Sequence, residues 1–140
     1  MKRIVVGTDM SPRSEGAVEV AVQLASAMGA TVHLVTAYAS PTVGMGPEVM
    51  VVPNHAELAE GTKVDLEAMA ASLRAKGLAV EIHPCMGDAV TALCSVAEAV
   101  DADLIVVGNK GMHGAARVLG SVPNKVAHKA SCNVLIARTA

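Results

Sequence analysis

Residues 3–12 read Arg3-Ile4-Val5-Val6-Gly7-Thr8-Asp9-Met10-Ser11-Pro12, and this stretch decides the fold. The run from Arg3 to Val6 is β-rich and unbroken, which is typical of a strand buried on both faces, as in parallel sheets. Ser11 then offers an N-cap and Pro12 the first helical position, and apolar residues recur at helical spacing as far as Met28. The opening therefore predicts a strand over 3–6, a turn, and a helix over 12–28.

The same alternation of strand and helix continues to the end of the chain. Further strands are predicted at 32–38, 79–83, 104–107 and 134–137, further helices at 55–76, 88–100 and 121–130, and a Pro- and Gly-containing loop at 39–54. Strands that alternate with helices of this length pair in parallel through crossover connections. We therefore expect one α/β domain over residues 1–140, an open, doubly wound, five-stranded parallel sheet of Rossmann-like type with helices on both faces.

Composition and charge exclude several partners. The formal net charge is -2, and the chain has one tyrosine and neither Phe nor Trp. Because single-strand binders use aromatic platforms and basic grooves, we expect no nucleic acid partner. The first apolar run is too short for a signal peptide and no stretch has membrane-spanning length, so a cytoplasmic protein without a membrane partner is expected.

Cysteine and histidine spacing predicts no metal site. The three cysteines form no CxxC pair, so buried, inert thiols are expected rather than a disulfide framework or a zinc site. Most histidines stand singly, without the spacing of metal ligands, and receive no predicted function; these are His33, His55, His83 and His128.

A glycine-rich loop from Gly108 to Ser121 follows the fourth predicted strand and is the strongest functional signal. Glycines allow positive φ and close backbone approach to a phosphate, and successive amides can form an anion-binding nest. Gly120-Ser121 adds a helix N-terminus at the end of the loop, and Lys110 and Arg117 could add positive charge. The structural alternative is that the glycines only turn the chain between strand and helix. The loop is neither a Walker A sequence nor the GxGxxG turn that follows a first strand.

The whole chain resembles the universal stress protein family. The resemblance rests on Ile4 to Ser11 with Ser14 and Ala17, on Asp103 to Gly108, on Gly120 to Val122, and on Cys132 to Ile136. It implies an adenine nucleotide α-hydrolase-like fold and a loop that wraps the phosphates and ribose of ATP. In nucleotide-binding members the loop has one residue more than here, where eight residues, Met112 to Leu119, separate Gly111 from Gly120. The shorter loop leaves open a tighter ATP site, a pocket that favours AMP or cyclic AMP, or no binding.

The resemblance and the loop together predict a set of nucleotide-binding residues. Asp9 resembles the family acid near adenine and ribose, where it could also share a Mg²⁺ ion with phosphate; an N-cap or Asx-turn is its structural alternative. Ala37 corresponds to the position whose backbone meets adenine. The predicted nucleotide-binding residues are Gly7, Thr8, Asp9, Ala37, Gly108, Asn109, Lys110, Gly111, Met112, His113, Gly114, Arg117, Gly120, Ser121 and Val122.

Three functions remain open from the sequence. The first is a stress-response or signalling module that binds ATP or a related adenine nucleotide, with no catalytic residue assigned. His113 is then a solvated loop residue, since no nucleophile or carboxylate is fixed beside it. The second is a slow ATPase or nucleotide hydrolase that uses Asp9, His113 and a metal. The third is a non-binding module whose function is homodimerisation, because residues 133–138 resemble the edge strand through which family members pair, and an open edge favours pairing.

Overall fold

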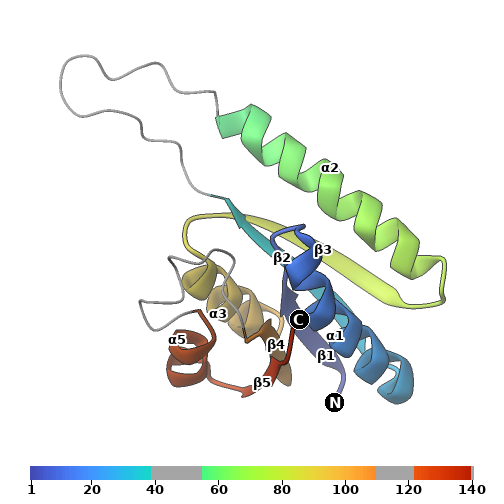
Figure 1. Ribbon diagram of the computed structural model, residues 1–140. Helices are drawn as coiled ribbons and strands as arrows, with labels where there is room; N and C mark the ends of the chain where they lie inside the picture. Colours follow the sequence, from blue (N-terminus) through green and yellow to red (C-terminus); the bar gives the residue numbers. More distant parts are fainter. Residues whose placement is uncertain (39–54, 110–121, 140) are drawn as a thin grey trace.

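The computed structural model describes residues 1–38, 55–109 and 122–139 (Figure 1). Its elements are β1 (Arg3–Gly7), the 3-10 turn η1 (Pro12–Ser14), α1 (Glu15–Met28), β2 (Thr31–Tyr38), α2 (His55–Arg74), β3 (Ala79–Met86), α3 (Ala89–Ala99), β4 (Leu104–Gly108), α5 (Val122–Lys129) and β5 (Asn133–Ala137). The five strands form one sheet in the order β3-β2-β1-β4-β5, and every neighbouring pair is parallel. The predicted fold class is thereby confirmed.

The strand order places the reversal of the sheet between β1 and β4. From β1 the chain adds β2 and β3 on one side, and it then returns to add β4 and β5 on the other. The start of β1 is held beside β4 by the Asp103 carboxylate, which accepts hydrogen bonds from the amides of Lys2 (2.7 Å) and Arg3 (3.0 Å). The carboxyl ends of β1 and β4 are therefore neighbours at the point where ligands bind in doubly wound sheets.

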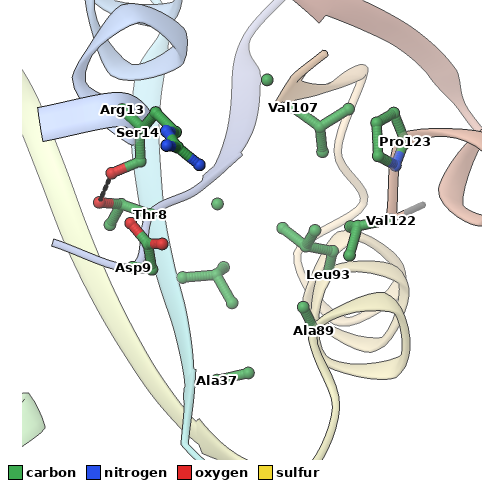
Figure 2. Close-up of a pocket in the computed structure, with 13 residues that line it drawn as sticks. Thr8, Asp9, Arg13, Ser14, Ala37, Ala89, Leu93, Val107, Val122 and Pro123 are labelled. Atoms are coloured by element: carbon green, nitrogen blue, oxygen red, sulfur yellow. Dashed lines mark hydrogen bonds between the residues drawn. The ribbon is translucent and has the colours of Figure 1, made fainter. Parts of the chain in front are cut away.

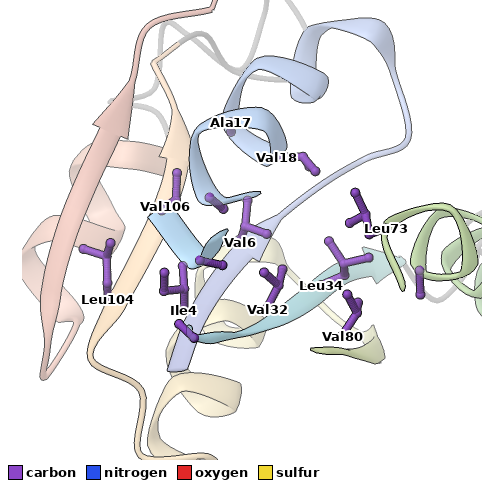
Figure 3. Close-up of a cluster of buried hydrophobic side chains, with 14 of the residues drawn as sticks. Ile4, Val6, Ala17, Val18, Val32, Leu34, Leu73, Val80, Leu104 and Val106 are labelled. Carbon is purple, nitrogen blue, oxygen red and sulfur yellow. The ribbon is translucent and has the colours of Figure 1, made fainter. Parts of the chain in front are cut away.

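Helices cover both faces of the sheet, as Figure 1 shows for α1 and α2 on one side and α3 and α5 on the other. The side covered by α1 and α2, here called the α1/α2 face, carries an apolar cluster that includes Ile4, Val6, Val32, Leu34 and Val106, all fully buried (Figure 3). The opposite α3/α5 face carries a second cluster around Val5, Val35, Leu93, Ile105 and Val126. Alternate residues of each strand enter opposite clusters, as the two-residue period of a strand requires.

Two element boundaries differ from the sequence prediction by three residues, and the others differ by two or fewer. Residues 12–14 form a 3-10 turn rather than the first turn of an α-helix, and Ser11 is its N-cap; such turns are frequent at helix N-termini. The predicted end of the third strand at His83 is wrong, because β3 continues through Pro84 to Met86. β3 is an edge strand, where the missing N–H of a proline leaves no ladder partner unsatisfied.

The three cysteines are free thiols. Cys94 is buried as predicted, whereas Cys85 and Cys132 are half-buried. Burial raises the pKa of all three thiols, which favours the protonated, less reactive form. Within the described part of the chain, no helix combines the length and apolar character needed to cross a membrane.

Candidate functional site

A pocket opens at the carboxyl ends of β1 and β4. The empty space inside it is about 680 Å³, with the open solvent at its mouth included. The residues that line it are Gly7, Thr8, Asp9, Arg13, Ser14, Val35, Ala37, Ala89, Leu93, Val107, Gly108, Val122 and Pro123. The pocket therefore lies where a doubly wound sheet is expected to bind a ligand, at the strand ends where the strand order reverses.

The two walls of the pocket differ in chemistry. Figure 2 shows Thr8, Asp9, Arg13 and Ser14 together on one side. The facing wall is apolar and consists of Ala89, Leu93, Val107, Val122 and Pro123, with Ala37 on β2 nearby. Among the described lining residues, Asp9 is the one carboxylate and Arg13 the one cation. The pocket therefore suits a ligand with an apolar, flat part and a polar or anionic part.

Thr8 is fixed by hydrogen bonds from every side. Its amide donates to the Val35 carbonyl (2.9 Å), and its carbonyl accepts from the Thr36 hydroxyl (2.7 Å). Its own hydroxyl shares a hydrogen bond of 2.9 Å with the Ser14 hydroxyl and accepts one from the Met10 amide (3.0 Å). With 6% of its surface exposed, Thr8 acts mainly to hold the end of β1 against β2 and η1.

Asp9 forms the Asx-turn that was the structural alternative for this residue. Its Oδ1 accepts hydrogen bonds from the Ser11 amide (2.9 Å) and from the Ser11 hydroxyl. Burial by itself raises the pKa of the Asp9 carboxyl, but hydrogen bonds from Ser11 and Ser14 outweigh it, so the pKa lies below its ordinary value. An ionised carboxylate at the pocket wall can accept a hydrogen bond from a ligand hydroxyl or contribute an oxygen ligand to Mg²⁺.

Gly7 and Gly108 lie at closely packed positions, and neither is explained by a positive φ. A Cβ on Gly7 would lie 3.2 Å from Leu93 Cδ2, and a Cβ on Gly108 would lie 3.1 Å from Thr139 Cγ2. Neither glycine is among the described residues with positive φ. The positive φ lies instead at Met10, at 68°, where the chain turns between Asp9 and η1; such left-handed non-glycine residues cluster at functional sites.

Asn109 makes contacts away from the pocket. Its Oδ1 accepts hydrogen bonds from the Thr139 amide (2.8 Å) and hydroxyl (3.0 Å), and its amide donates to the Ala137 carbonyl (2.8 Å). These bonds tie the end of β4 to the end of β5 and to Thr139 after it, and Thr139 is buried there. Asn109 is not among the pocket residues, so its predicted ligand contact stays a prediction.

The structure thus brings together part of the predicted set. Gly7, Thr8, Asp9, Ala37, Gly108 and Val122 line one pocket. Apart from Asn109, the remaining predicted residues lie outside the described residues; they are Lys110, Gly111, Met112, His113, Gly114, Arg117, Gly120 and Ser121. The sequence interpretation missed lining residues from η1, α3, α5 and the strand interiors, namely Arg13, Ser14, Val35, Ala89, Leu93, Val107 and Pro123. Of these, Arg13 and Ser14 carried a usable signal, because they follow a strand end that was already a predicted site.

Comparison with known proteins gives a consistent family. Residues 1–138 match the profile of the universal stress protein family. The universal stress protein Rv1636 of Mycobacterium tuberculosis is 37% identical over 145 aligned positions, which cover 99% of this chain and 97% of the relative. The universal stress protein A homolog 1 of Coxiella burnetii is 30% identical over 136 positions, which cover 96% of this chain and 94% of that protein.

Solved structures show the same similarity. A universal stress protein crystallised in complex with cAMP superimposes with a TM-score of 0.74 at 35% identity, covering 99% of this chain and 98% of the other. The universal stress protein from Archaeoglobus fulgidus in complex with dAMP superimposes with a TM-score of 0.68 at 24% identity, covering 100% of this chain and 98% of the other. The second likeness bears on the fold alone.

Proposed function

This chain belongs to the universal stress protein family, and from that premise we propose that it binds an adenine nucleotide (ATP, AMP or cyclic AMP) in the pocket between β1 and β4. The observation that carries the proposal is the division of this pocket into one polar and one apolar wall (Figure 2). A nucleotide has the same division, an apolar ring at one end and charged oxygens at the other.

The apolar wall offers a slot for the adenine ring. Leu93 and Val122 on this wall present aliphatic side chains, and Val35 and Ala37 add small apolar side chains from β2. Such a slot buries the flat faces of the ring by the hydrophobic effect, because no aromatic residue that could stack on a base is among the described residues that line the pocket. The small size of Ala37 leaves space that a larger side chain would fill.

The polar wall offers partners for the ribose and phosphates. Asp9, ionised at neutral pH, can accept hydrogen bonds from the ribose hydroxyls or share a Mg²⁺ ion with the phosphates. Arg13 can donate paired hydrogen bonds to phosphate oxygens. The Gly108 to Ser121 loop supports the proposal through its sequence, as a backbone cradle for the phosphates. The universal stress protein that shares 35% identity and crystallised with cAMP supports an adenine ligand.

Isothermal titration with ATP, AMP and cAMP tests the proposal when it compares wild type with Ala37→Leu. Overfilling a packed site costs about 1–3 kcal/mol, so the variant should lose roughly 5- to 150-fold in affinity. The matched control is Ala27→Leu, the same change at an exposed position of α1, which should bind as wild type does. If no adenylate binds at millimolar concentration, or if Ala37→Leu binds unchanged, the proposed site is wrong.

Substitutions in the loop separate the phosphate contacts from the adenine slot. Gly111→Val and Gly120→Val place a side chain where the backbone is expected to meet phosphate, so they should weaken ATP far more than adenosine. Equal affinity of wild type and both variants for ATP would remove the phosphate cradle from the proposal, while the Ala37→Leu result would still decide the adenine slot.

Within this proposal the chain is a stress-response or signalling module that binds nucleotide without turning it over. No histidine, cysteine or lysine is among the described residues that line the pocket, and the Thr8 and Ser14 hydroxyls there hydrogen-bond to each other. No hydroxyl of the described lining is therefore paired with a histidine or lysine base. Phosphate release from ATP should equal the buffer blank. Release that exceeds the blank and is lost in Asp9→Ala would establish the slow hydrolase instead.

We also infer that two copies pair through β5. β5 is an edge strand, and Ile136 on it is 46% exposed, so both unpaired backbone groups and an apolar side chain face outward. Ile136→Lys should shift the mass measured by light scattering from dimer to monomer. A wild-type protein that is monomeric at micromolar concentration would contradict this inference.

A further inference from the structure

Two histidines from neighbouring strands meet on the α3/α5 face of the sheet. His33 lies on β2 and His83 on the edge strand β3, and the parallel register sets Val35, two residues after His33, opposite His83. His33 Nδ1 lies 2.9 Å from His83 Nε2, and the ring centroids are 5.1 Å apart. The prediction that these histidines stand singly is therefore wrong, because strand pairing joins positions that are 50 residues apart.

A carboxylate completes a group of three potential ligands. Glu81, which the register places opposite His33, has its Oε1 3.8 Å from His33 Nδ1. One ligand atom from each of His33, Glu81 and His83 lies within 4.8 Å of the other two. Two imidazoles and a carboxylate are the donor set of many open zinc sites.

The three residues differ in exposure in a way that suits a metal site. His33 is 3% exposed, His83 is half-buried, and the side chain of Glu81 is 64% exposed. His33 and His83 are thus held in the sheet, and Glu81 can move to meet an ion that enters from solvent. Burial lowers the pKa of both imidazoles, with a further contribution at His33 from His83, although Glu81 acts in the opposite direction. Neutral imidazole is the form that binds metal.

We propose that His33, Glu81 and His83 form a binding site for a divalent transition metal ion of the Zn²⁺ class, with its fourth position open to water. In a tetrahedral site with metal–nitrogen bonds of about 2.0–2.1 Å, ligand atoms lie about 3.3 Å apart. The His–His distance of 2.9 Å and the His–Glu distance of 3.8 Å lie on either side of that value. Because both facing nitrogens must be unprotonated to bind the ion, the ring that carries the proton between them takes the tautomer with that proton on its other nitrogen. Mg²⁺ or Ca²⁺, which prefer oxygen ligands, should not compete.

This site is separate from the proposed nucleotide site. None of the three residues lines the pocket at the ends of β1 and β4, although Val35 on the same strand does. The metal proposal therefore does not depend on nucleotide binding, and it can be tested in protein freed of nucleotide.

The test is a Zn²⁺ titration of nucleotide-free protein in competition with a chromophoric chelator. Wild type should bind one ion per chain. His83→Gln and Glu81→Gln should each weaken binding about 100-fold or more, since loss of partners outside the ligand set already costs roughly 10–100-fold. His128→Gln, at an exposed histidine of α5, and Cys85→Ser, on the same strand as His83, should bind as wild type does.

Two measurements on the wild type complete the test without relying on a variant. Co²⁺ should give the intense visible absorption of a four-coordinate site. Long-range ¹H–¹⁵N spectra should show Zn²⁺-dependent shifts of the ring nitrogens of His33 and His83, with those of His128 unchanged. Absence of saturable binding, equal affinity of wild type and His83→Gln, or loss of binding in Cys85→Ser would overturn the proposal and leave a hydrogen-bonded histidine pair.

Discussion

The two faces of this sheet are built from the same strands but carry different groups. On the α1/α2 face, alternate strand residues such as Ile4, Val32 and Leu34 join one apolar cluster (Figure 3). On the α3/α5 face, the intervening positions include apolar residues as well as the pocket residues Gly7 and Ala37 and the cluster of His33, Glu81 and His83. Packing thus dominates one face, whereas the other carries part of the pocket lining and the histidine cluster.

The covering helices explain the difference. α1 and α2 span 14 and 20 residues, whereas α3 and α5 span 11 and 8. α2 packs along the edge strand β3, while α3 packs mainly on β1 and β2. The α3/α5 face of β3 is therefore less covered, so His83 and Glu81 can remain partly in water. Adjacent residues of one strand can in this way serve different purposes, one in the buried core and the next as a polar group accessible to water.

Substitution of the adjacent residues Leu34 and Val35 tests this division with the largest expected effect. Leu34 is fully buried on the α1/α2 face, so Leu34→Ala should lower the free energy of unfolding by about 2–5 kcal/mol. It should leave the affinity of the folded protein for adenylate unchanged. Val35→Ala removes two carbon atoms rather than three and should destabilise less, but it enlarges the pocket and should change adenylate affinity. Urea unfolding and calorimetry measure the two quantities.

Val64→Ala is the control for Leu34→Ala. Val64 lies on α2 and is 57% exposed, so its truncation should change stability by no more than about 0.5 kcal/mol. If Leu34→Ala weakens adenylate binding in the folded protein while Val35→Ala does not, the proposed separation of core packing and ligand binding between the two faces is wrong.

Gly7→Ala tests how tightly the α3/α5 face is packed beside the pocket. The new Cβ would lie 3.2 Å from Leu93 Cδ2, so Leu93 must shift, and overpacking of this kind costs about 1–3 kcal/mol. Urea unfolding should show this loss, and Gly7→Ala combined with Leu93→Val should recover part of it. If the single and double variants show additive losses, Leu93 is not the obstacle.

The sequence predicted what is encoded locally. The strand-to-turn segment 3–9, the helical periodicities and the glycine-rich loop are each contiguous, so they identified the fold class and the location of Gly7, Thr8 and Asp9 at a strand end. Thr8 lies in the pocket wall, yet its hydrogen bonds to Val35, Thr36 and Ser14 show that it also has a structural role. Residue type and position along the chain cannot separate those two roles.

The histidine cluster could not be predicted from the chain alone. His33 and His83 have no common motif, and their contact depends on the register of β2 with β3, in which a shift of one residue would move His83 to the opposite face. Leu93 lies within the predicted helix over 88–100, but its place opposite Gly7 depends on how α3 packs on β1. Both are consequences of tertiary packing that local patterns do not specify.

Asp88→Ala should have the smallest effect, and it concerns the helix that covers the α3/α5 face. Asp88 is the N-cap of α3, and its Oδ2 accepts a hydrogen bond from the Thr91 amide (3.0 Å). Loss of an N-cap costs about 1 kcal/mol, and Asp88→Asn should retain most of it, because an asparagine oxygen accepts the same bond. Urea unfolding at pH 7 should rank wild type and Asp88→Asn above Asp88→Ala.

The pH dependence distinguishes the charge of Asp88 from its hydrogen bond. The bond from the Thr91 amide lowers the pKa of the Asp88 carboxyl in the folded protein. A lowered folded pKa stabilises the protein above the unfolded pKa, about 3.9, and this contribution is lost as the pH falls through the folded pKa. The stability difference between wild type and Asp88→Asn should therefore shift against wild type on acidification. If the stability difference between wild type and Asp88→Asn stays constant from pH 7 to strongly acidic pH, the charge of Asp88 does not contribute to the cap of α3. The helix that covers the α3/α5 face would then be as insensitive to acid at its N-cap as the apolar cluster on the opposite face.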